Sequence, residues 1–301
     1  MRVTIMTFAA ILLFVAGAAW AQGDTTNAGW TKSLINNLTV TQTSYSDSWV
    51  GGEAGSVNWV WNLDGTAERP LSPKVDIKST LRLKFGQTLS ENAETKHWAK
   101  PVKSTDLIDW ENVLRFTLGA VVDPYAAVRL ESQFFDATWP MKNLYLSPLK
   151  LTESFGVARV FFKKDKEVVT SRIGFAVREI FKKSVVDTIT RATTDSTLTD
   201  GGMESVTDAT LNLGKNLQYV GKLGIFKAFF SSESNREQPI GKQYVGVHWS
   251  TPDVNWENTF TAAVTKIINV SLYTQLLYDR DIDARGRFKE TLALGFSVRL
   301  M

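Results

Sequence analysis

The chain has only two histidines, His97 and His248, and the second stands two residues before a serine. In His248-Trp249-Ser250 an imidazole and a hydroxyl are spaced so that the histidine could take the proton of a serine attacking an ester. Such a nucleophile also needs rigid donors for the oxyanion and a group that orients the base. No orienting Asn is identifiable, Pro252 follows closely, and no Gly-rich segment adjoins Ser250. We therefore predict no catalytic residue and expect that the chain is not an enzyme.

A second candidate for chemistry is an acidic cluster near the C-terminus. Asp279, Asp281 and Asp283 have the one-three-five spacing of a calcium-binding loop, and Glu290 falls at its twelfth position. Ala284 stands where that loop needs glycine for a sharp turn, and the flanking segments have the pattern of strands rather than helices. The carboxylates also have basic neighbours that can neutralise them: Arg280, Arg285 and Arg287. We therefore expect no metal site and no cofactor.

A third group of polar residues recurs at every second position inside otherwise apolar segments. If such a segment crosses a bilayer, a Lys or Arg that faces lipid at the midplane costs about 2–4 kcal/mol, so these side chains must face a lumen. The predicted lumen-lining residues are Asp76, Lys78, Arg82, Lys84, Asp109, Glu111, Arg115, Arg129, Glu131, Arg172 and Arg178.

The lumen-lining set has two interpretations. It is either a web of ion pairs that fills and rigidifies the interior, or the lining of a polar pore whose excess of positive charge favours anions. For a barrel wider than an eight-stranded one and narrower than a porin, the web is favoured.

The elements that must position these residues are strands, because the chain alternates at period two almost throughout. The C-terminal strand is typical: Leu292, Leu294, Phe296, Val298 and Leu300 alternate with small or polar residues. About twelve such segments are predicted, most of them long enough to cross a membrane at a tilt, which takes ~9–11 residues. They lie near 30–43, 56–64, 74–87, 106–122, 125–136, 152–162, 168–181, 204–214, 217–230, 254–267, 269–279 and 287–300.

The connections between these segments alternate in length. Those near Asp123-Pro124, Lys163 to Glu167, Lys215-Asn216 and Ile268-Asn269 are tight, and only the 64–73 link is longer than a turn should be. The long connections are 88–105, 137–151, 182–203 and 231–253. Short periplasmic turns and long extracellular loops are typical of an outer-membrane barrel. The predicted fold is an all-β, antiparallel transmembrane barrel of about twelve strands.

The N-terminus has the pattern of an export signal. Arg2 precedes an apolar run from about Ile5 to Ala18, and Ala19-Trp20-Ala21 is a small-x-small cleavage signature. We expect a signal peptide at 1–21 and a single barrel domain at 22–301. No linker or repeat divides the mature chain, and the soluble alternative, a secreted β-sandwich or lipocalin-like barrel, would need two domains at this length.

Composition excludes several classes. The chain has no cysteine, so no disulfide or thiolate metal site is possible. Its 34 Lys and Arg against 31 Asp and Glu are interspersed, which does not indicate a nucleic-acid partner. The partners expected are the outer-membrane lipid bilayer and, during insertion, the barrel-assembly machinery, with the barrel itself a monomer.

Several short segments resemble a family of uncharacterised outer-membrane barrels of Gram-negative bacteria, domain of unknown function 3078. The likeness implies a location and a fold, and it carries over no catalytic residue. The segments are Trp49-Val50-Gly51-Gly52 with Asn58-Trp59, Ser147-Pro148 with Phe155-Gly156, Val254 to Glu257, Lys266 to Ser271, Leu277-Tyr278-Asp279, Phe288 to Thr291 and Gly295-Phe296.

The leading functional hypothesis is a narrow conduit or binding pocket for a small anionic solute. A non-transporting structural or docking barrel is the first alternative, because the long loops are rich in Trp and Tyr. The His-x-Ser spacing is similar to that of outer-membrane phospholipases, which are also twelve-stranded barrels, so a lipid hydrolase using His248 and Ser250 is the last alternative.

Overall fold

The computed structural model describes residues 29–45, 54–139, 142–165, 167–187, 189–232, 249–280 and 283–300. Nearly all of them are strand or tight turn, and among them no helix is long and apolar enough to span a membrane. The strands are β1 (Thr31–Thr43), β2 (Ser56–Ser72), β3 (Val75–Ser90), β4 (Val102–Phe116), β5 (Asp123–Ser132), β6 (Phe135–Asp136), β7 (Leu144–Tyr145), β8 (Leu149–Lys164), β9 (Glu167–Val185), β10 (Thr193–Asn212), β11 (Leu217–Ser231), β12 (Asp253–Ala263), β13 (Ile268–Tyr278) and β14 (Arg287–Arg299).

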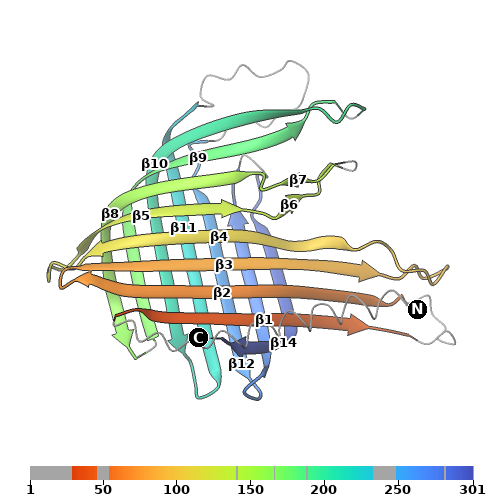
Figure 1. The fold of residues 1–301 in the computed structure, drawn as a ribbon, viewed down its shortest axis with the longest axis horizontal. Helices are drawn as coiled ribbons and strands as arrows, with labels where there is room; N and C mark the ends of the chain where they lie inside the picture. The colour runs from red at the N-terminus through yellow and green to blue at the C-terminus, as the bar shows by residue number, and fades with distance from the viewer. Residues whose placement is uncertain are drawn as a thin grey trace.

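Twelve of these strands form one closed antiparallel barrel, and β6 and β7 form a separate two-stranded sheet. Each barrel strand pairs with its neighbour in the chain, and β1 closes the sheet against β14, with Ile35 opposite Arg299 and Val40 opposite Leu294. In Figure 1 the wall of β1 to β5 lies in front of the wall of β10 to β14, and the two sets of strands cross steeply. The predicted architecture, an all-β barrel of about twelve strands, is confirmed.

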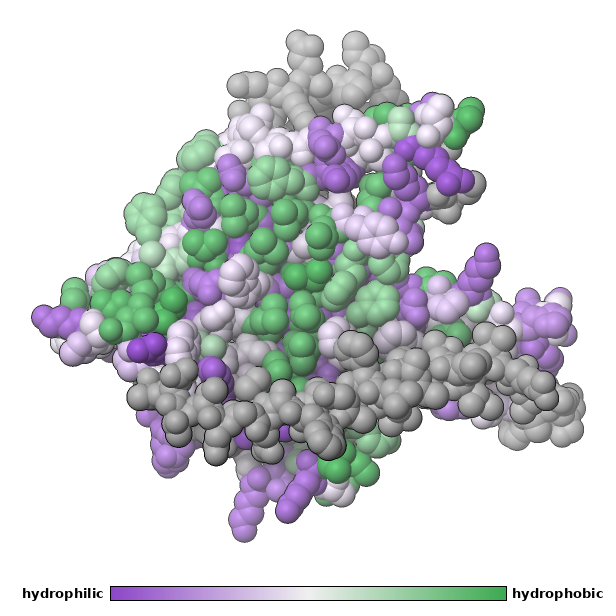
Figure 2. Space-filling model, in the orientation of Figure 1, coloured by the Kyte–Doolittle hydropathy of each residue, from purple (hydrophilic) through white to green (hydrophobic). Residues whose placement is uncertain are grey.

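The alternation of residue types decides which face of each strand points outward. On β14, Leu292, Leu294, Phe296 and Val298 are exposed on the outer side, whereas Ala293 between them is buried. The face seen in Figure 2 has hydrophobic side chains gathered across the middle of the strands and a further hydrophobic group at the left, with many hydrophilic side chains around the periphery. An apolar band of this kind faces the hydrocarbon of a bilayer.

Chain ends and connections give the barrel its orientation. β1 begins and β14 ends at the edge where the short turns lie, which is the periplasmic edge in barrels of this type. The expectation of a long link at 64–73 is wrong: β2 continues to Ser72, so only Pro73 and Lys74 turn the chain. The cross-strand partners of residues 64–70 are in β3, and this pairing holds the segment as strand.

Two other predicted boundaries differ from the structure. The fourth barrel strand ends at Phe116, and the turn lies at 117–122, before Asp123-Pro124 rather than at it. The eighth begins at Thr193 rather than near 204, so most of the predicted loop at 182–203 is strand. The pairing of β9 with β8 stops at Phe181, and the pairing of β10 with β11 stops at Asp200. From there β9 and β10 continue as a two-stranded ribbon, paired only with each other, which ends at Val185 opposite Thr193.

The wall beside β5 is built differently from the rest. β5 has ten residues and its pairing with β4 stops at Ile108 opposite Ser132, whereas β4 continues to Val102 along β3. The β6–β7 hairpin follows β5 at the loop end of the barrel, and side chains attach it to β4 on one side and β9 on the other. The Asp106 carboxylate accepts the backbone N–H groups of Phe134 and Phe135 at 2.6 and 3.1 Å.

Lys103 completes this attachment to β4, and Ser147 makes the attachment to β9. Lys103 pairs with Asp106 at 3.1 Å and also donates to the Phe135 carbonyl. On the other side, the Ser147 hydroxyl accepts the Lys183 backbone N–H at 3.0 Å. Side-chain contacts therefore close a stretch of wall that a backbone ladder closes elsewhere.

Two glycines let β8 and β9 approach each other closely. Gly156 and Gly174 are opposite one another, and a Cβ on either would lie closer than 3.0 Å to backbone of the facing strand. Real Cβ atoms do not make such contacts, so both positions require glycine. The Tyr125 hydroxyl also lies over Gly174, and Tyr125 packs with Ala127 and Ala158 in a small interior cluster.

Candidate functional site: a belt of ion pairs across the lumen

One ion pair joins opposite walls of the barrel. The Arg82 Nη1 atom on β3 lies 3.2 Å from the Glu257 Oε2 atom on β12. These strands are five steps apart in the sheet order (β12, β13, β14, β1, β2, β3), so the contact runs through the interior. Arg82 also contacts Asp109 of the neighbouring β4. The charged faces of these strands therefore point into the lumen.

A second contact joins β4 and β11, which are also five steps apart through β5, β8, β9 and β10. The Lys222 Nζ atom lies 3.3 Å from Oε2 of Glu111. Arg172 on β9 pairs with the other oxygen of the same carboxylate and reaches Glu204 at 3.7 Å. Glu111 thus holds two cations from two different strands.

Arg129 connects these contacts with the wall of β4 and β5. Its Nε atom lies 2.8 Å from Oδ1 of Asp109, and its Nη2 atom lies 2.9 Å from Glu131. Glu131 in turn pairs with Lys150 at 2.6 Å. We call the central group the waist; its members are Arg82, Asp109, Glu111, Arg129, Arg172, Lys222 and Glu257.

Lys84 is held against the waist by an aromatic ring as well as by charge. Its Nζ atom lies 4.6 Å from the centroid of Tyr273 and 3.9 Å from Glu257. The Tyr273 hydroxyl contacts the same Glu257 oxygen at 3.4 Å. A cation over a ring face is attracted by the electron density of that face, so Tyr273 orients Lys84 without adding charge.

The remaining predicted residues lie toward the two ends of the lumen. At the turn end, Arg115 pairs with Asp76 at 3.1 Å. At the loop end, Arg178 pairs with Asp253 at 2.8 Å and lies over the Phe226 ring. Lys78 shares the inner face of β3 by alternation; within the described ranges it forms no ion pair, and it is exposed.

Exposure changes along the lumen. At the waist the side chains of Asp109, Glu111 and Arg172 are only 3%, 8% and 7% exposed. Those of Asp76 at the turn end and Lys150 at the loop end are 28% and 31% exposed. The waist carboxylates are therefore less exposed than most charged side chains toward the two ends, with Asp200 at the loop end, 7% exposed, as an exception.

Sequence reasoning did not include seven ion-pair partners of the predicted residues: Glu257, Lys222, Glu204, Lys150, Asp123, Asp200 and Asp253. The signal was present for Glu257, which alternates with Val254, Trp256 and Phe260 as a polar position on a strand. Which residues meet across the lumen depends on strand tilt and stagger, and one strand's pattern does not contain these.

The other candidates for chemistry are placed only in part. His248 lies outside the described residues, and Ser250 is in a turn beside Trp249, which packs against the cluster of Ala176, Phe226 and Ala228. Asp281 also lies outside them. The Arg285 side chain pairs with Asp283 at 3.2 Å, and this hydrogen bond lowers the pKa of the Asp283 carboxyl. Across the described ranges, no three His, Cys, Asp or Glu residues are grouped to hold a metal ion.

Comparison with protein families bears out the sequence resemblance. Residues 40–137 match the family model described as a protein of unknown function (DUF3078). The match covers the Asn58-Trp59 strand; the C-terminal segments, which also carried the resemblance, lie outside it. No curated protein matches the chain.

Several solved structures share the barrel. The COG4313 outer membrane channel from Pseudomonas putida F1 is 12% identical, with a TM-score of 0.39, covering 91% of this chain and 97% of that one. The translocator domain of autotransporter NalP from Neisseria meningitidis is 9% identical, with a TM-score of 0.34 and 97% of both chains covered. The CymD monoaromatic hydrocarbon channel is 9% identical, with a TM-score of 0.29, covering 89% and 88%. At these values the likenesses carry nothing about solute or partner.

The protein is an outer-membrane-type β-barrel whose apolar outer face is embedded in a lipid bilayer. The twelve described barrel strands close into one sheet, and the outward hydrophobic residues match the hydrocarbon region. The predicted signal peptide at 1–21 lies outside the described residues.

Proposed function

We propose that the protein is a narrow conduit for a small polar solute, with the waist as its constriction. The observation that carries the proposal is the difference in exposure along the lumen: Asp76 and Lys150 toward the two ends are more exposed than Glu111 and Arg172 at the waist, where side chains rather than backbone meet. Side chains can move aside without unfolding the wall.

The sign of the solute's charge is a finer part of the proposal. The sequence favours an anion, with Arg82, Lys84, Arg115, Arg129, Arg172 and Arg178 as the residues that would attract it. Each of these cations contacts a carboxylate, and paired charges create little net potential. We therefore propose selection by size first, with any preference for anions arising only where a pair opens.

A non-transporting barrel is the second candidate, and the Arg82–Glu257 contact favours it. That pair ties two opposite walls together and leaves the centre closed in this conformation. In this reading the loop side, including the β9–β10 ribbon, would meet a partner outside the cell.

Planar-bilayer recording of the purified, folded chain separates the two candidates. The informative variant is Arg82→Ala with Glu257→Ala, because removing both ends of the bridge keeps the net charge of the lumen unchanged, although Lys84 then loses Glu257. A conduit predicts discrete conductance in the unmodified protein and a larger step in the double variant. The matched control, Asp283→Ala with Arg285→Ala, removes an exposed loop pair and should leave conductance unchanged.

If neither the unmodified protein nor the double variant shows conductance, the conduit is contradicted and the non-transporting barrel remains. Folding of each preparation is checked by its altered gel migration before and after boiling. A reversal potential that shifts toward anions only in the double variant would support the finer proposal. One chain per conduit is expected because each chain closes its own barrel.

We further propose that the chain does not hydrolyse lipid. Ser250 is on a turn next to a packed tryptophan, and no Gly-rich segment beside it would supply oxyanion donors. Incubation with phospholipid should release no fatty acid, and Ser250→Ala should change nothing. Release that this single substitution abolishes would overturn the proposal.

A further inference from the structure

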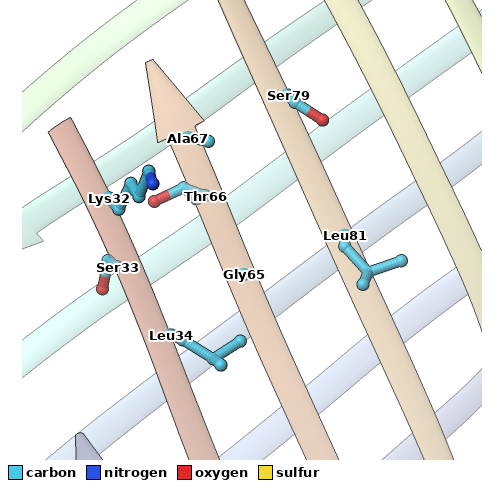
Figure 3. A pocket seen from close by; sticks show the side chains of 8 residues that line it. All are labelled: Lys32, Ser33, Leu34, Gly65, Thr66, Ala67, Ser79 and Leu81. Carbon is cyan, nitrogen blue, oxygen red and sulfur yellow. The ribbon is translucent and has the colours of Figure 1, made fainter. Parts of the chain in front are cut away.

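The outer face of the barrel has a hollow near its periplasmic edge. It has a volume of about 200 Å³ and is bordered by residues of β1, β2 and β3 (Figure 3). Leu34, Gly65 and Leu81 are opposite one another in register, and Gly65 leaves the space between the two leucines without a side chain. Leu81 precedes Arg82, which faces the lumen, so this row faces outward into the bilayer.

The next row toward the periplasmic edge is more polar. It contains Lys32, Ala67 and Ser79, which are also opposite one another, and the Ser79 hydroxyl accepts the indole N–H of Trp110 at 3.1 Å. Trp110 itself is opposite Leu81, so its indole reaches from the apolar row to the polar one. Lys32 is the second residue of β1, so the polar row begins close to the periplasmic end of this strand, and the hollow continues from it toward the hydrocarbon.

Two cations at this edge have no counter-ion among the described residues. The Arg69 guanidinium lies 5.9 Å from the Trp30 ring centroid, and Lys32 is exposed and extends toward β2 in Figure 3. Within the described ranges neither side chain forms an ion pair. β14 ends before it reaches Lys32: Leu300 already bonds to Leu34, so no described strand covers this side of β1.

We infer that this surface binds one glycerophospholipid of the periplasmic leaflet. Lys32 and Arg69 hold its phosphate, and one acyl chain lies in the hollow over Gly65. Two unpaired cations at headgroup level match an anionic phosphate, and the polar-to-apolar order of the rows matches the order along a lipid. Burial of the acyl chain in the hollow contributes packing contacts but no hydrophobic transfer free energy, because the acyl chain moves from one apolar medium to another. The headgroup contacts therefore supply the selectivity.

Native mass spectrometry of the folded full chain tests this inference with phosphatidylglycerol as the probe. One retained lipid per barrel is expected. Lys32→Gln with Arg69→Gln should weaken retention at least tenfold, and Gly65→Leu should weaken it by filling the hollow. Lys78→Gln removes a cation from the inner face of β3 and should leave retention unchanged.

If all variants retain the lipid equally, the retained lipid is only the non-specific layer around the barrel, and the inference is overturned. If Gly65→Leu fails to fold, Gly65→Ala replaces it, since its Cβ would meet only the flexible end of Leu34 at 3.3 Å and ordinary contacts beyond. Displacement of the lipid by inorganic phosphate alone would mean that the site binds free phosphate rather than a lipid. The result does not depend on conductance, so the conduit can fail while the lipid site stands.

Discussion

Arg82 and Glu257 meet inside the barrel with 3.2 Å between Nη1 and Oε2, although five strand steps separate β3 from β12. A pair this far apart around the sheet ties the two walls directly. Buried ion pairs are weak contributors to net stability, because desolvation offsets attraction, but losing one partner is costly. The waist is therefore best tested by removing single carboxylates at different depths.

Asp109→Asn should destabilise the barrel by about 3–5 kcal/mol, because it removes the carboxylate that Arg82 and Arg129 share and leaves one buried positive charge in excess, even though Glu257 and Glu131 remain. Asp76→Asn, at the more exposed turn end, should cost about 1 kcal/mol or less. Urea unfolding of the lipid-refolded protein measures both. Equal losses in the free energy of unfolding for the two variants would contradict the idea that the cost depends on how deeply the carboxylate is buried.

Gly174→Ala should destabilise or misfold the barrel, because its Cβ would lie closer than 3.0 Å to the Phe155 backbone and to the Tyr125 hydroxyl. Gly214→Ala is the matched control: nothing lies within 4 Å of a Cβ at that position. The fraction with folded gel migration after refolding reports the difference. A normal yield of Gly174→Ala would refute the close approach of β8 and β9.

Asp106→Ala should release the β6–β7 hairpin while the barrel remains folded. The N–H groups of Phe134 and Phe135 would lose their acceptor, and we expect at least tenfold faster hydrogen exchange there, about 1.4 kcal/mol of lost protection. Asp136→Ala, which removes only a cap within the hairpin at Thr138, serves as control. Unchanged exchange at Phe134 would show that Asp106 does not hold the hairpin.

The loop after β9 should respond to acid. Hydrogen bonds from the Thr190 side chain and from the backbone of Ile189 and Thr190 lower the pKa of the Asp187 carboxyl. A lowered folded-state pKa means that the turn is stabilised above the ordinary carboxyl pKa and loses this contribution as pH falls through the lowered value.

NMR amide shifts of Ile189 and Thr190 should therefore titrate below the ordinary aspartate range. Asp187→Asn keeps an acceptor oxygen but cannot titrate, so its shifts should be flat with pH. Titration that persists in the Asn variant would assign the effect to another group.

The sequence predicted most of the barrel and part of its interior. Regular alternation, as on β3 and β14, identified strands and the faces that carry Arg82 and Leu294. The alternation did not identify the β9–β10 ribbon, because residues 193–199 are mostly polar on both faces. This segment is a strand because its backbone pairs with β9. The partners across the lumen are fixed by how the closed sheet is staggered, which no local pattern reports.

The unequal strand lengths give the barrel a sloping rim. β10 has twenty residues and β9 nineteen, whereas β5, two places away from β9, has ten (Figure 1). As far as the described strands go, a large body that approaches this end contacts the ribbon before it contacts the rim beside β5, and it meets that rim obliquely. The described wall is thus a ramp that rises from β5 to the ribbon rather than a level ring.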